Sequence, residues 1–72
     1  MARQIGSRVK IVSGGMREFH GSTGTVVDIE RHRGEPVMYR VYLDVPVRVQ
    51  GFGAVMDDLW CGECLQTLRG ER

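Results

Sequence analysis

The chain has 72 residues, which is enough for one domain with a single small core and too short for two. Hydrophobic residues make up 42% and charged residues 26%, and no apolar run approaches the roughly 20 residues of a membrane-spanning helix, so the composition indicates a globular domain. The formal net charge of +1 excludes a chain that attracts nucleic acid through its overall charge.

We expect one domain over residues 1–72, with frayed tails at 1–4 and 69–72. The first six residues contain no apolar signal segment, which favours a cytoplasmic location. Residues 1–40 hold seven Arg or Lys against four Asp or Glu, whereas residues 41–72 hold three against five. This uneven distribution is compatible with one basic face.

The first predicted strand covers residues 5–12. Its apolar residues Ile5, Val9 and Ile11 share one side, and Arg8 and Lys10 occupy the other. Residues 13–23 have glycine and serine at both ends, with Phe19 and a few polar residues between them. This pattern predicts a long loop that inserts one or two apolar side chains into the core.

A second strand follows, in which two sets of side chains alternate: Thr25, Val27 and Ile29 on one side, and Val26, Asp28 and Glu30 on the other. After a polar turn, every second residue from Val37 to Val49 is apolar, the strongest periodic signal in the chain. Pro46 cannot donate a ladder hydrogen bond. We therefore predict a third strand at 37–45 and a projecting arm over residues 45–55.

The remaining segments are short. Residues 54–61 predict a fourth strand, 62–64 a 3₁₀ turn, and 65–68 a fifth strand. Trp60 is expected in the core. Ten glycines, together with many Val and Thr residues, favour strands and tight turns over helices.

Residues 21–29, GSTGTVVDI, match the pattern Gly-x-x-Gly-x-Val-x-x-Ile, and the chain here resembles KOW-type domains. Residues 39–44 and 59–68 are similar to the ending of small bacterial SH3-like barrels. The resemblance implies an all-β fold: a single five-stranded SH3-like barrel with one short 3₁₀ turn before the last strand. Gly21 and Gly24 would permit positive φ or a close approach of strands.

The resemblance implies a small non-catalytic binding module, and nucleic acid is the favoured partner. Charged groups would contact the phosphate backbone, an aromatic ring would stack on bases, and the amides of Gly14 and Gly15 could bind an anion. The candidate residues for this interface are Arg8, Lys10, Arg17, Phe19, His20, Arg31 and Arg33. The alternative is a solvated strand face whose basic residues are balanced by Glu18, Asp28 and Glu30.

The arm predicts a second kind of partner. Ordinary loops are polar, but residues 45–55 are apolar on one side, and exposed apolar surface often marks an interface. The arm would then bind another protein or a second copy of the chain through Val47, Val49, Phe52 and Val55. Alternatively, the arm folds back and covers one end of the domain.

Cys61 and Cys64 form a C-x-x-C pair, which leaves three interpretations open: a reduced structural pair, half of a metal site, or a redox pair. We favour the first and expect no metal and no cofactor. No nucleophile–base–acid set is apparent, so we expect no enzyme and no small-molecule substrate. A faint resemblance of residues 49–52 to the Val-Gln-Ile-Tyr segment of trimethoprim-resistant dihydrofolate reductases lacks the central side chain at Gly51.

Overall fold

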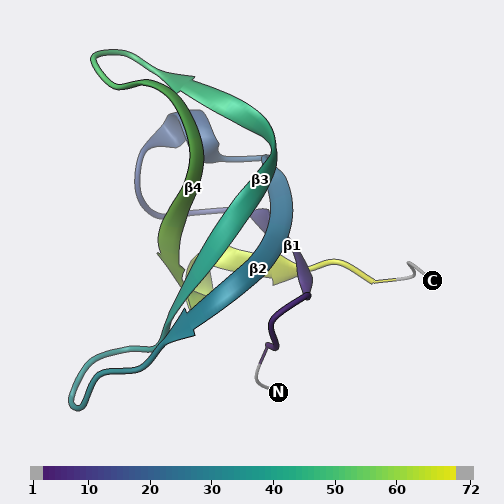
Figure 1. Ribbon diagram of the computed structural model, residues 1–72, viewed down its shortest axis with the longest axis vertical. Coiled ribbons are helices and arrows are strands. Elements are labelled where there is room, and N and C mark those ends of the chain that lie inside the picture. Colours follow the sequence, from purple (N-terminus) through teal and green to yellow (C-terminus); the bar gives the residue numbers. More distant parts are fainter. Residues whose placement is uncertain (1–2, 70–72) are drawn as a thin grey trace.

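A computed structural model describes residues 3–69 of the chain. Its strands are β1 (Arg8–Ile11), β2 (Thr23–Glu30), β3 (Met38–Val49), β4 (Gly53–Cys61) and β5 (Leu65–Thr67). They form one antiparallel sheet in the order β4-β3-β2-β1-β5 (Figure 1). Residues 3–69 include no α-helix, so the prediction of an all-β chain with five strands is confirmed.

Two 3₁₀ turns connect the strands: η1 (Arg17–Phe19) and η2 (Gly62–Cys64). The turn η2 precedes β5, as predicted. The turn η1 was not predicted; it lies inside the long loop after β1 and carries Phe19 into the core, where its ring is only 3% exposed. Phe19 is therefore the apolar insertion expected from this loop.

The first strand is shorter than predicted because the chain turns before it. Val9 and Ile11 are fully buried, whereas Ile5 is 63% exposed and lies before β1. The amide of Gly6 donates to the carbonyl oxygen of Val26 at 2.7 Å, with Gly6 at a φ of 98°. Positive φ is inaccessible to an extended strand, so the alternation of Ile5 with Val9 does not continue into the core.

Arg3 was expected in a frayed tail but is held by the end of the sheet. Its Nε donates to Thr67 Oγ1 at 3.0 Å and its Nη2 donates to the carbonyl oxygen of Leu65 at 2.7 Å. Its guanidinium also lies 5.7 Å from the ring centroid of Tyr39. Residues 1–2 and 70–72 of the two predicted tails lie outside the described residues.

A bulge in β2 breaks the predicted alternation of the second strand. The register of β2 with β3 shifts between Val26 and Asp28, so Val27 is an extra residue. Val26 is fully buried and Ile29 packs against the core, although the sequence pattern placed them on opposite sides. An extra residue reverses the side on which every later side chain lies.

A larger irregularity divides the β3–β4 hairpin. Tyr42 pairs with Asp57 and Val47 pairs with Val55, so β3 has three more residues than β4 between these pairs. Pro46 lies in this interval, where a residue without an amide hydrogen costs no ladder bond. Beyond it the two strands continue to a tip that projects from the sheet (Figure 1). The predicted break near Pro46 is confirmed, although β3 continues through it to Val49.

Gly24 lies where β2 approaches β3 closely. A Cβ atom on this glycine would overlap the backbone oxygen of Tyr42 and lie 2.8 Å from Cγ1 of Val41. Both obstacles belong to the adjacent strand, which cannot move without losing ladder bonds. The close approach predicted for Gly24 is confirmed, and Gly21 has the predicted positive φ, at 94°.

Replacing Gly24 should therefore destabilise the fold. We expect Gly24→Ala to lower the free energy of unfolding by about 1–3 kcal/mol, the usual cost of overpacking a tight site. Urea unfolding followed by Trp60 fluorescence measures this change. Gly62→Ala is the matched control, because the nearest atoms to its added Cβ are at 3.4 Å or more. Equal stability of the two variants would contradict the proposed steric constraint.

Candidate functional site

The outer face of β1, β2 and β3 carries a closed network of polar side chains. Arg8 Nη1 and Nη2 donate to the two carboxylate oxygens of Asp44 at 2.8 and 2.6 Å. Thr23 Oγ1 donates to the same carboxylate at 2.6 Å, and Thr25 Oγ1 accepts from Arg8 at 2.9 Å. Arg8 is therefore neutralised by a bidentate carboxylate, although its partner is Asp44 and not one of the three carboxylates named in the alternative interpretation of the basic face.

These contacts hold the pKa of Asp44 low. The hydrogen bond from Arg8, then that from Thr23, lower the pKa of this carboxyl from 3.8 to about 2. Both groups are more than one third exposed, so solvent screens the pair and its contribution to stability is modest. The network fixes the orientation of Arg8 more than it stabilises the fold.

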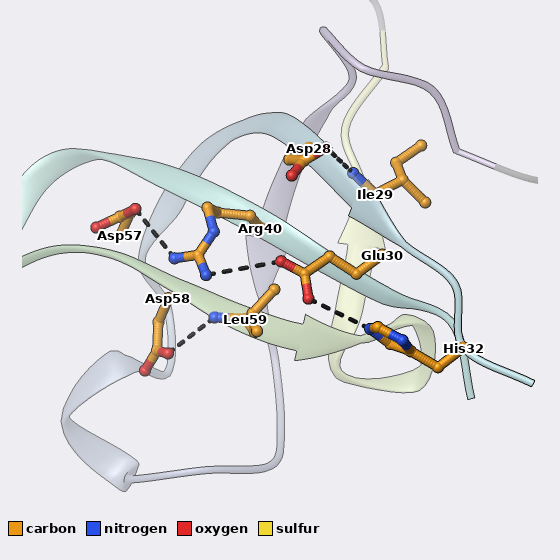
Figure 2. Close-up of polar contacts among 8 residues, drawn as sticks. All are labelled: Asp28, Ile29, Glu30, His32, Arg40, Asp57, Asp58 and Leu59. Carbon is orange, nitrogen blue, oxygen red and sulfur yellow. Dashed lines mark hydrogen bonds and ion pairs between the residues drawn. The ribbon is translucent and has the colours of Figure 1, made fainter. Parts of the chain in front are cut away.

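A second polar cluster, with two carboxylates, surrounds Arg40. Its Nη1 is 3.2 Å from Asp57 Oδ2 and its Nη2 is 3.8 Å from Glu30 Oε2 (Figure 2). The other oxygen of Glu30 lies 3.8 Å from His32 Nε2. Together with the Arg8–Asp44 pair, this cluster leaves the middle of the outer face without an excess of positive charge.

The other predicted phosphate-binding residues are separated in space. Arg17 is exposed on η1, beside the β3–β4 hairpin, whereas Arg31 and Arg33 are exposed in the β2–β3 loop at the other end of the long axis (Figure 1). Lys10 is half-buried on β1, between Thr23 and Gln66. The predicted residues therefore do not converge on one surface.

Two members of the predicted interface have structural roles. Phe19 is buried against Trp60, with ring centroids 5.4 Å apart and planes at 68°, so the prediction that it stacks on bases is wrong. The Nε2–H of the exposed His20 donates to the carbonyl oxygen of Gly14 at 2.7 Å and so links the two sides of η1. The loop is thus organised by the core and by its own backbone.

The predicted anion-binding glycines are exposed, but a side chain on either of them would point into the core. A Cβ on Gly14 would overlap Cys64 Sγ, and one on Gly15 would lie 2.7 Å from Cζ3 of Trp60. Both glycines have positive φ. Close packing therefore explains why both positions are glycine, and anion binding is not required to explain it.

The β3–β4 hairpin presents the largest exposed apolar side chain of the described residues. Phe52 at its tip is 73% exposed, whereas Val49 is buried and Val47 and Val55 are half-buried against the core. Beside Phe52 is a hollow of about 180 Å³. It is lined by Met16, Phe19, Val49, Phe52, Val55 and Asp58.

Sequence reasoning missed two contributors to this region. Met16 lines the hollow and is 43% exposed, and Asp58 adds a carboxylate to the same rim. Only the apolar character of Met16 within a polar loop indicated an inserted side chain. No local pattern indicated Asp58, because its place at the rim depends on the shifted pairing of β4 with β3.

The two cysteines are free thiols whose sulfur atoms lie 3.0 Å apart. Within residues 3–69, no three His, Cys, Asp or Glu side chains are grouped so as to hold a metal ion. Trp60 packs in the core as expected; its indole nitrogen is buried and makes no hydrogen bond.

Comparison with protein-family models, with curated proteins and with solved structures returned no match. Over the described part of the chain, no helix has the length and apolar character required to cross a membrane.

The Arg8–Asp44 pair makes stability depend on pH. The native pKa of Asp44 lies below that of the unfolded chain, so its contribution is complete above about pH 4 and is lost as pH falls toward 2. We expect an NMR titration of the Asp44 carboxyl carbon to have its midpoint near 2, and Arg8→Gln to raise it toward 3.8. Glu35→Gln, in the exposed β2–β3 loop, should leave it unchanged. A wild-type midpoint near 3.8 would exclude the pair in solution.

Proposed function

We propose that this chain is a small non-catalytic binding module that pairs with a second copy of itself through the β3–β4 hairpin. The observation that carries the proposal is the exposed ring of Phe52 next to an apolar hollow on the same surface. A ring of this size buries well over 100 Å² on transfer out of water, so its exposure is costly in a monomer.

The hairpin surface is self-complementary. It offers a protruding aromatic side chain and, within the same patch, a hollow whose floor is formed by the buried Phe19 and Val49. A twofold dimer requires the same patch on both subunits, so each Phe52 can enter the hollow of the other copy. The net charge of +1 gives two copies little reason to repel each other.

The strand β4 provides a second element of the same interface. In the sheet order it is an edge strand that pairs with β3 alone. An open edge can add a strand from another chain through main-chain hydrogen bonds. The hollow lies along this strand, between Val55 and Asp58, so side-chain insertion and strand pairing occur on one continuous surface.

The proposal includes the finer fold assignment, an SH3-like barrel of the KOW type. It is supported by the order β4-β3-β2-β1-β5, which brings the last strand beside the first, and by η2 directly before β5. The buried Leu65 in β5 matches the closing strand of such barrels. A cytoplasmic location and the absence of catalysis remain predictions.

The hairpin proposal predicts an apolar dimer. Sedimentation velocity at increasing protein concentration should show a monomer–dimer equilibrium, and Phe52→Ser should weaken it at least about tenfold, as expected for a central aromatic contact. Ile5→Ser is the control, since Ile5 is similarly exposed but lies outside the hairpin. High salt should change the equilibrium little, because the contacts are apolar. A wild-type chain that stays monomeric at millimolar concentration contradicts the proposal.

Nucleic-acid binding is a second candidate, favoured by the β2–β3 loop. Arg31 and Arg33 are exposed there and make no ion pair with any other described residue. The loop projects beyond the sheet (Figure 1), and both arginines are exposed, so a phosphate backbone can approach them. This interface would use one loop and not the whole set of basic residues predicted from the sequence.

The two candidates differ in their response to salt. If two arginines contact phosphates of single-stranded RNA, removing both should reduce the slope of log affinity against log salt by about 1.4. Fluorescence anisotropy with a labelled oligonucleotide compares wild type with the Arg31→Gln, Arg33→Gln double variant. Arg69→Glu serves as a control for total charge. Equal affinities for wild type and the double variant would eliminate this loop as a nucleic-acid site.

A further inference from the structure

Cys61 and Cys64 are arranged for a reaction that neither proposed binding function uses. Cys61 ends β4 and Cys64 ends η2, and their Sγ atoms are 3.0 Å apart. A disulfide requires about 2.05 Å, so the sulfur atoms need to approach by only about 1 Å. A change of this size is available to side-chain rotation and needs no movement of the strands.

The backbone around the pair is fixed on both sides. The amide of Leu65 donates to the carbonyl oxygen of Gly62 and closes η2, and the amide of Val12 donates to the carbonyl oxygen of Cys64 at 2.8 Å. Gly14 packs directly against Cys64 Sγ from the opposite loop. These contacts keep Cys64 facing Cys61 and limit its access to other reactants.

The two thiols differ in exposure. Cys64 is buried, and its hydrogen bond with Cys61, followed by burial, raises the pKa of its thiol, so it remains protonated at neutral pH. Cys61 is half-buried and borders two hollows of about 460 and 280 Å³. The lining of the larger hollow includes Cys61 and not Cys64, whereas both cysteines line the smaller one, so a small reagent in the larger hollow would encounter Cys61 first.

We propose that Cys61 and Cys64 form a reversible intramolecular disulfide by exchange with low-molecular-weight disulfides, with Cys61 as the entry thiol. Cys61 loses its proton to the solvent, and its thiolate attacks the reagent disulfide, whose S–S bond breaks and releases one thiolate, leaving a mixed disulfide. Cys64 then loses its proton to the solvent, and its sulfur attacks the sulfur of Cys61. The second reagent thiol leaves. In total, two protein thiols are oxidised and one reagent disulfide is reduced to two thiols.

The test is equilibration of the folded protein with mixtures of reduced and oxidised glutathione in the presence of a metal chelator. After acid quenching and alkylation, intact-mass spectrometry distinguishes the dithiol, the mixed disulfide and the internal disulfide. We expect the wild-type monomer to lose two hydrogen atoms and both alkylation sites in one transition. Oxidation mainly to covalent dimers, or to a mixed disulfide that persists, overturns the proposal.

Single variants test the assignment of the entry thiol. Cys64→Ser should accumulate the mixed disulfide at Cys61, whereas Cys61→Ser should react at least about tenfold more slowly, because its remaining thiol is buried. Equal reaction rates would contradict the assignment. Since either variant could disturb the fold, wild type is also compared in buffer and in urea. The equilibrium constant for forming the internal disulfide should be about tenfold or more higher in buffer than in urea, because the fold aligns the thiols. Equal constants in the two conditions overturn the proposal.

This reaction does not depend on self-association. Phe52→Ser leaves both thiols and their neighbours in place, so it should form the internal disulfide to the same extent as wild type. Failure of the dimer measurement would leave this result unchanged.

Discussion

The edge-to-face contact between Phe19 and Trp60 connects the loop after β1 to the strand β4. Both the hollow beside Phe52 and the packing over Cys64 depend on this contact. The loop has no strand of its own, so it is held by this contact and by backbone bonds at its ends, such as that from Gly21 to Ile11. Gly15 presses against the same indole, which only a glycine permits. With the loop in this position, Phe19 becomes the floor of the hollow beside Phe52, and Gly14 closes over Cys64.

Hydrophobic alternation predicts this fold well wherever each residue of a strand faces one residue of its neighbour. Val9 and Ile11 in β1 illustrate this case, because the pairing of β1 with β2 and with β5 has no interruption. The pattern fails at Val27 and between Tyr42 and Val47, where one strand has extra residues. A bulge is determined by which strands pair and how they twist, and a single strand contains no information on its partner. The turn η1 was missed because three residues inside a long loop are too few for a periodic signal. The equally short η2 was predicted because residues 62–64 separate two predicted strands.

The charges of the site show a similar limit. The sequence identifies Arg8 as an outward residue of a basic strand, but its partner Asp44 is 36 positions away and lies two strands across the sheet. Their contact depends on the register of two separate strand pairs. The apolar arm was easier to identify because its residues are consecutive. Even there, each of the two alternatives holds for different residues of the arm. Val49 covers the core, whereas Phe52 remains exposed as an interface would require.

The hairpin tip and the dithiol lie at opposite ends of β4, which raises the question of whether oxidation would alter association. The hollows at the two ends share Met16, Phe19 and Asp58, so they are continuous along one face. The ladder between β3 and β4, however, is interrupted between Tyr42 and Val47. For oxidation to change association through the sheet, an element between the two sites must have two arrangements, and each site must shift the balance between them. A shift of about 1 Å between the sulfur atoms is small enough for the interruption to absorb it. The structure therefore favours two independent sites on one strand over a redox-controlled interface.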